Sequence, residues 1–144
     1  MSNINYVEII NNTIQDTDVY LISYISTEGY PITKALTSPR KIEPHGTYYF
    51  STVNHSMKTE SYRKNPKASL YFLDREKYIG VSLVGRMEII DDIESKKVFW
   101  LPTDNMFYPN GIESDDYVIL KFTAESGRLY AQIQHINFDP QEIL

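Results

Sequence analysis

The chain of 144 residues contains no cysteine. Disulfide scaffolds, cysteine-ligated zinc, iron–sulfur clusters and thiol nucleophiles are therefore excluded together. A chain of this length can bury a sufficient core without such cross-links. The absence of cysteine also fits a reducing compartment, and we expect a cytoplasmic protein.

Long apolar runs are absent as well. No stretch approaches the roughly 20 apolar residues that a membrane helix needs. The N-terminal residues 1–5 have neither the basic nor the apolar region of a secretory signal. Positive charge is also sparse, because the formal net charge is −5 and no basic stripe occurs. We therefore expect neither a membrane nor a nucleic-acid partner.

The familiar catalytic motifs are missing. His45, His55 and His135 are isolated from one another, and their spacing matches no known metal-binding motif, so we expect no metal site. No P-loop, no G-x-S-x-G and no G-x-G-x-x-G pattern occurs. The paired carboxylates Asp91–Asp92 and Asp115–Asp116 are explained by a helix cap and by the entry to a strand. No catalytic side chain can be named from the sequence.

What is present is a β-rich pattern in one domain spanning residues 1–144, with no repeat and no linker. Strands are predicted at residues 19–26, 32–37, 47–52, 68–73, 78–90, 117–124 and 128–136. Short helices are predicted at 4–12, at 59–64 and from an N-cap at Asp91 to about Trp100. The remaining segments read as a loop at 38–46, a turn at Ser126–Gly127 and a tail at 138–144. Gly85 lies within a strand, which often marks a bulge or a close backbone approach. The pattern favours a mainly antiparallel barrel or sandwich and leaves both open.

Residues 46–58 contain the clearest functional signal. An aromatic strand ends in a polar turn that carries Ser56 and Lys58, and a helical segment follows. Hydroxyl groups, a helix N-terminus and a lysine together suit an anionic phosphate. A solvated surface turn is the alternative. The chain is also rich in tyrosine, with twelve Tyr and six Phe but one Trp, which suits either flat cofactor pockets or an ordinary β core.

The order of several short motifs resembles a known family. These motifs comprise Gly29-x-Pro31-x-x-Lys34, Tyr49-Phe50-Ser51-Thr52-x-x-x-Ser56-x-Lys58, Asn65-Pro66-x-x-Ser69-Leu70, Tyr78-x-x-Val81-x-x-x-Gly85-x-Met87-x-x-Ile90-Asp91, Trp100 and Phe107-Tyr108-Pro109-x-Gly111. Their order and spacing are similar to those of the pyridoxamine 5′-phosphate oxidase-like split-barrel family, and within it to the general-stress-protein subgroup. The resemblance covers roughly residues 5–130.

The resemblance implies a fold and a cofactor. The fold is a six-stranded antiparallel split barrel of the Greek-key type with short peripheral helices. Such proteins form homodimers that hold one FMN in each of two clefts between the subunits. FMN is the cofactor implied here, and a small molecule of unknown identity is the implied substrate.

The resemblance also implies site residues. Thr33, Lys34, Ala35 and Leu36 would run beside the flavin ring and ribityl chain. Ser51 and Thr52 would hydrogen-bond the flavin edge, and Met57 and Lys58 would hold the phosphate. Trp100 and Phe107 are candidates for the far wall of the cleft, from the same subunit or from its partner, and Tyr130 stands where many relatives place a Trp. Core packing is the alternative for these three aromatic residues.

Two departures from the family pattern bear on function. Lys34 replaces the usual Arg, which keeps the charge and loses the planar fork. Arg128-Leu129-Tyr130 lacks the His of the substrate-gripping Arg-x-His motif, which argues against oxidation of pyridoxamine 5′-phosphate itself. Three hypotheses remain open: an FMN-dependent oxidoreductase, a flavin- or haem-binding stress-response module without turnover, and a ligand-free structural dimer.

Overall fold

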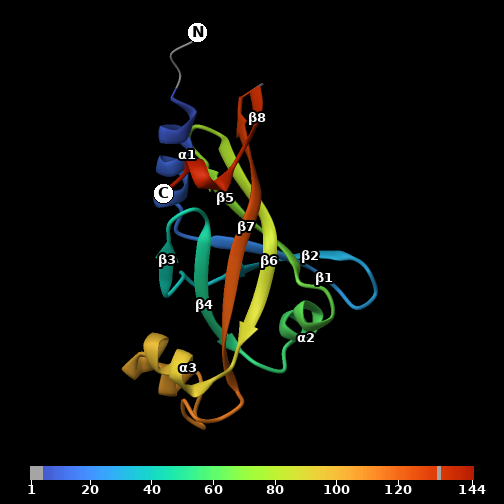
Figure 1. The fold of residues 1–144 in the computed structure, drawn as a ribbon, viewed down its shortest axis with the longest axis vertical. Coiled ribbons are helices and arrows are strands. Elements are labelled where there is room, and N and C mark those ends of the chain that lie inside the picture. Colours follow the sequence, from blue (N-terminus) through green and yellow to red (C-terminus); the bar gives the residue numbers. More distant parts are fainter. Residues whose placement is uncertain (1–4, 133) are drawn as a thin grey trace.

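The computed structural model describes residues 5–132 and 134–144. Antiparallel strands dominate the described residues, and three helices and two short 3₁₀ turns lie before, between and after them (Figure 1). The helices are α1 (Tyr6–Gln15), α2 (Met57–Lys64) and α3 (Ile93–Phe99), and the 3₁₀ turns are η1 (Pro102–Met106) and η2 (Pro140–Glu142). The strands are β1 (Tyr20–Ile25), β2 (Pro31–Leu36), β3 (Lys41–Glu43), β4 (Thr47–Val53), β5 (Lys67–Asp74), β6 (Ile79–Ile90), β7 (Tyr117–Ala131) and β8 (Gln134–Phe138).

The strands form one open sheet in the order β2-β1-β5-β6-β7-β4-β3, with β8 added beside β7. Strands β5, β6 and β7 follow one another as antiparallel neighbours. Strand β4, which precedes them in the chain, pairs with the other edge of β7. This arrangement is a Greek key. The mainly antiparallel split-barrel prediction is confirmed, because the two ends of the sheet do not pair.

The predicted number of six strands was wrong, since the described residues form eight. The short strand β3 lies within the predicted loop at 38–46, where it pairs with β4. The predicted turn at Ser126–Gly127 is also wrong, because β7 continues through both residues. The chain reverses only after Ala131 and returns as β8.

A bulge at Glu125 explains why the sequence suggests a turn there. The pairing with β6 shifts between Val84 and Gly85, so Glu125 has no opposite residue. One extra residue exchanges the two faces of a strand. The core-facing residues of β7 are Leu120 and Phe122 before the bulge and Leu129 after it. The predicted role of Gly85 is confirmed, because a Cβ there would lie 2.0 Å from the carbonyl oxygen of Thr123.

The core is filled by aromatic rings. Tyr20, Tyr48, Phe50 and Phe72 pack with ring centroids 5.6–6.3 Å apart in most pairs. Helix α1 contributes Ile10 and Ile14 to the same cluster. The helix begins after an Asn5 cap and extends beyond the predicted end at residue 12; Ile4 lies outside the described residues. The predicted tail is partly ordered, since η2 leads to the buried Ile143.

A second, smaller cluster lies where β4 and β7 meet α3 and η1. Helix α3 begins after Asp92, whose carboxylate accepts a hydrogen bond from the backbone N–H of Ser95. The predicted cap at Asp91 was therefore one residue early. No helix among the residues described is both long and apolar enough to cross a membrane.

Candidate functional site

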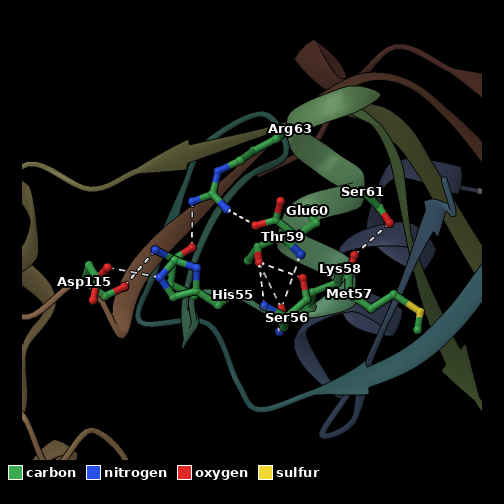
Figure 2. Close-up of polar contacts among 10 residues, drawn as sticks. His55, Ser56, Met57, Lys58, Thr59, Glu60, Ser61, Arg63 and Asp115 are labelled. Atoms are coloured by element: carbon green, nitrogen blue, oxygen red, sulfur yellow. Dashed lines mark hydrogen bonds and ion pairs between the residues drawn. The ribbon is translucent and has the colours of Figure 1, made fainter.

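Helix α2 begins at the polar turn that the sequence singles out, two residues earlier than predicted. Ser56 is its N-cap and forms a capping box with Thr59: the Ser56 Oγ accepts from the Thr59 N–H at 3.3 Å, and the Thr59 Oγ1 accepts from the Ser56 N–H at 3.0 Å. The cap fixes the first turn of the helix, whose free N–H groups favour an anion. Figure 2 shows Ser56, Lys58 and Thr59 gathered at this end.

Lys58 is the unusual residue of this helix. Its exposed fraction is only 5%, and its Nζ donates to the Ser56 Oγ at 3.2 Å. Among the described residues no carboxylate lies within ion-pair distance of it. Burial, and to a lesser degree the positive charge of Lys34, lower the pKa of Lys58 to about 8. A desolvated lysine facing a second lysine creates a site that favours an anion.

Strand β2 lies at one edge of the sheet and carries the four residues expected beside the flavin. Lys34 pairs with the fully buried Ile22, and Leu36 pairs with Tyr20, so both lie on the core-facing side. Thr33 and Ala35 lie on the opposite face, where the Thr33 Oγ1 is 3.2 Å from the Ser23 Oγ. The structure thus brings Lys34 to Lys58 and leaves Thr33 and Ala35 exposed.

Helix α2 is anchored to the neighbouring strand β1 by Tyr62. The Tyr62 hydroxyl donates to the carbonyl oxygen of Ser23 at 2.9 Å, and its ring packs edge-on against Tyr24. This contact holds α2 against β1, and Lys34 on the paired strand β2 lies close enough to Lys58 to lower the pKa of Lys58. Met57, which the sequence pairs with Lys58 as a phosphate-binding residue, differs from Lys58 in its surroundings. Its apolar side chain is 69% exposed.

Ser51 and Thr52 lie near the end of β4, and their side chains point to opposite faces of the sheet. Thr52 is buried on the same side as Phe50, whereas the Ser51 Oγ lies 3.1 Å from the hydroxyl of Tyr117 in the second cluster. Either hydroxyl can be the donor in this bond. Burial raises the pKa of Tyr117. The Trp100 ring packs edge-on against Tyr117 with centroids 4.9 Å apart.

Trp100 and Phe107 belong to the segment formed by residues 93–107, which we call the α3–η1 arm. Arg40 holds this arm in place, because its guanidinium donates to both carboxylate oxygens of Asp104 and to the carbonyl oxygen of Phe99. Hydrogen bonding from Arg40 lowers the pKa of Asp104. Phe107 projects from the arm with 69% of its surface exposed.

The structure therefore divides the predicted site residues into two groups. Lys34 on β2 lies near Lys58 at the start of α2. Ser51, in contrast, lies with Trp100 near α3. Figure 1 places α2 and α3 on different sides of the lower end of the sheet. Core packing accounts for Trp100 within one subunit, and it does not account for the exposed Phe107.

Tyr130 contacts other residues of the C-terminal hairpin. Its ring packs edge-on against His135 with centroids 5.0 Å apart, and Arg128 lies 5.5 Å above it. The Arg128 guanidinium also donates to Asn137. Arg128 is thus engaged within its own hairpin.

A hollow of about 520 Å³ lies elsewhere on the described part of the chain. It contains none of the predicted site residues. The residues that line it are Ser23, Tyr24, Ile25, Pro31, Lys67, Ala68, Ser69, Val84, Gly85 and Glu125. The residues described contain no group of three or more His, Asp and Glu side chains placed to hold a metal ion.

Sequence reasoning missed the residues that support the site. Tyr117 was assigned only to a strand, and neither Arg40 nor Asp104 was singled out. The partners of each pair lie 64 to 66 residues apart in the chain. No local pattern could join them, because their contacts arise only when β4, β7 and the arm come together.

Comparison with known proteins identifies the fold and the family. The family model described as pyridoxamine 5′-phosphate oxidase like matches residues 6–138. A structure from Clostridium acetobutylicum, of a protein related to general stress protein 26 of B. subtilis, shares 32% identity with a TM-score of 0.82. That alignment covers 96% of this chain and 97% of the other. A search of curated protein sequences finds no match.

Two further structures show the same fold at lower identity. General stress protein 26 from Bacillus anthracis is 16% identical with a TM-score of 0.69, over 94% of this chain and 100% of the other. A heme-binding protein from Mycobacterium smegmatis is 15% identical with a TM-score of 0.73, over 99% of this chain and 61% of the other. With the family match over residues 6–138, these findings lead to one assignment. The chain belongs to the pyridoxamine 5′-phosphate oxidase-like family, in its general-stress-protein subgroup.

Proposed function

We propose that this protein binds FMN and acts as a flavin-dependent oxidoreductase on a small substrate. The observation that carries the proposal is the environment of Lys58. This lysine is almost fully buried beside a second lysine, and no described carboxylate neutralises it. A buried charge without a partner is costly. A phosphate monoester would supply the missing negative charge.

The N-terminus of α2 would hold the phosphate of FMN. Lys58 and Lys34 supply charge, and the Ser56 hydroxyl and the first N–H groups of the helix supply hydrogen bonds. Met57 contributes only its backbone N–H, because its side chain is apolar and points to solvent. The residues Thr33 to Leu36 of the edge strand β2 would lie along the ribityl chain and the ring.

The flavin ring would lie in a cleft that two copies of the chain complete. Phe107 and Met106 are 69% and 81% exposed at the tip of the α3–η1 arm, and such neighbouring apolar side chains favour a protein partner. In a homodimer the arm of one subunit would reach the flavin of the other. This arrangement would let Trp100 and Phe107 line the same flavin site as Lys58, although they lie far from Lys58 within one subunit.

Bound FMN would supply hydride or electron transfer, while the protein supplies binding, orientation and exclusion of water. The electron donor that we test is a reduced nicotinamide, and the acceptor is a dye that takes up the same two electrons. Pyridoxamine 5′-phosphate is not proposed as the substrate. The segment Arg128-Leu129-Tyr130 has no histidine at the spacing of the substrate-gripping motif, and Arg128 is engaged with Asn137.

The test is an absorption spectrum of the purified protein with and without added FMN, followed by oxidation of NADH and NADPH with dye acceptors. We expect flavin bands that remain with the protein through gel filtration, and turnover above that of free FMN. A protein that takes up no FMN when it is supplied would contradict the proposal.

The second candidate is a flavin- or haem-binding module without turnover. The similar fold of the heme-binding protein from Mycobacterium smegmatis favours including it. Titration with haemin separates the two ligands, because a bound haem gives a sharp Soret band. A holoprotein with FMN bound and a rate equal to that of free flavin would favour the module over the enzyme.

A further inference from the structure

A buried amide is among the groups that hold the turn between β4 and α2. Asn54 has an exposed fraction of 7%, and it lies between the end of β4 and the cap of α2. Its backbone N–H donates to the carbonyl oxygen of Asp116 at 2.7 Å. Its side-chain Nδ2 donates to the carbonyl oxygen of Asp115 at 2.7 Å. These contacts tie the turn to the start of β7.

Arg63 completes the arrangement from the other end of α2. Its Nη2 donates to the Oδ1 of Asn54 at 2.6 Å. Its Nη1 donates to the carboxylate of Glu60 at 2.7 Å, as Figure 2 shows. The amide of Asn54 therefore uses both its donor and its acceptor side. Glu60 neutralises the guanidinium, so Arg63 acts here as a fixed hydrogen-bond donor.

The backbone between these anchors has a conformation that needs support. His55 has a φ of +53°, in the left-handed region, and Ser56 returns to an extended conformation before the helix begins. A non-glycine residue in the left-handed region is disfavoured unless its surroundings hold it there. The contacts of Asn54 lie immediately before this residue, and they orient Ser56 and Lys58 after it.

We propose that Asn54 and Arg63 are positioning residues that set the specificity of the α2 site for a phosphate monoester. This inference rests on the proposed function. The two side chains hold the turn so that the Ser56 hydroxyl, the helix N–H groups and Lys58 converge on one anion. Neither residue needs to touch the ligand. Their loss would weaken recognition of the phosphate and leave contacts with the flavin ring unchanged.

The experiment compares FMN with riboflavin, which lacks the phosphate. Wild-type protein should bind FMN more tightly than riboflavin by a factor of 100 or more. The variants Asn54→Ala and Arg63→Gln should each reduce this affinity ratio at least tenfold. The affinity for FMN should fall, and the affinity for riboflavin should stay unchanged. Asn54→Ala is the critical variant, because it leaves Arg63 in place. A direct contact of Arg63 with the phosphate would therefore survive in it.

Two controls separate positioning from general destabilisation. Glu60→Gln keeps the bond between Arg63 and Asn54 and should leave the ratio unchanged. Val81→Ala lowers stability from the core, far from the turn, and should lower the melting temperature without changing the ratio. If Asn54→Ala does not fold, Asn54→Ser takes its place, because it also removes the amide that Arg63 and Asp115 bind and leaves Arg63 unchanged.

The outcomes distinguish the two proposals. A wild-type protein that prefers FMN while both variants keep the full ratio would overturn the positioning role and leave the proposed function intact. A wild-type protein that binds neither flavin would overturn both. A ratio that falls in Val81→Ala as much as in Asn54→Ala would show a merely structural effect and would also overturn the positioning role.

Discussion

Arg40 and Asp104 form a bidentate ion pair across the smaller cluster, with N–O distances of 2.6 and 2.8 Å. Asp104 is almost fully buried, and its carboxylate also accepts from the backbone N–H of Leu101. Because Arg40 also bonds the carbonyl oxygen of Phe99, one guanidinium connects the end of α3 with η1. The ion pair thus determines where Trp100 and Phe107 lie.

Replacing Asp104 with Asn should release the α3–η1 arm. The change leaves a partly buried guanidinium without its counter-charge, which costs about 3 kcal/mol of unfolding free energy. Trp100 is the only tryptophan, so its emission should shift to longer wavelength as the arm becomes solvated. Urea denaturation followed by fluorescence measures both effects. Lys41→Ala removes an exposed ion pair with Glu43 and should change stability by less than about 1 kcal/mol.

Replacing Lys58 with Met should have opposite effects on binding and on stability. The variant removes an unpaired buried charge, so the ligand-free protein should gain on the order of 1 kcal/mol at pH 7. Affinity for FMN should fall by about 1–3 kcal/mol, since a charged hydrogen bond is lost. Calorimetry of both ligand-free proteins and FMN titration test this. Lys67→Met, at an exposed position on β5, is the matched control; equal loss of affinity in both variants would refute a specific role for Lys58.

The pH dependence of stability should reveal Lys58 directly. Its pKa is about 8 in the folded ligand-free protein and 10.5 without these surroundings. Between these values the unfolded chain binds more protons than the folded one, so the unfolding free energy rises with pH from about 8. Buried tyrosines such as Tyr48 and Tyr62 act in the opposite sense above pH 10, because burial raises their pKa.

The contribution of Lys58 is isolated by the difference in unfolding free energy between the wild type and Lys58→Met, measured from about pH 7 to about 9.5. The destabilisation of the wild type relative to the variant should shrink across this interval. Saturating FMN should remove the effect, because the phosphate keeps Lys58 protonated. A constant difference across the interval would mean that Lys58 does not titrate there.

Gly85→Ala should destabilise the protein by about 2–4 kcal/mol. An added Cβ would lie 2.0 Å from the carbonyl oxygen of Thr123 and 2.9 Å from the Cα of Ala124, and both contacts are with backbone. The strands must therefore separate at the bulge. Thermal unfolding measures the loss, and Ser82→Ala on the same strand is the control. An unchanged melting temperature for Gly85→Ala would contradict the close approach.

Parts of the site could be predicted because their signals are local. The turn that contains Ser56 and Lys58 combines a cap residue, a cation and a following helix within a few positions. The alternation in β6 and the glycine at position 85 likewise depend on neighbours in the chain. The errors have local causes too. Ser126 and Gly127 are typical turn residues, and the sheet accommodates them because the bulge at Glu125 restores the core-facing alternation.

The sequence by itself determined the β-rich class, the family and the place of the polar turn before α2, since these depend on composition, periodicity and motif order. Only the tertiary structure decided what surrounds that turn. Burial of Lys58 beside Lys34, the anchoring of Asn54 by Asp115 and Arg63, and the separation of Trp100 from α2 all involve residues from different strands and helices. Desolvation and hydrogen-bond geometry arise only when those elements pack, so no local pattern in the sequence contains them.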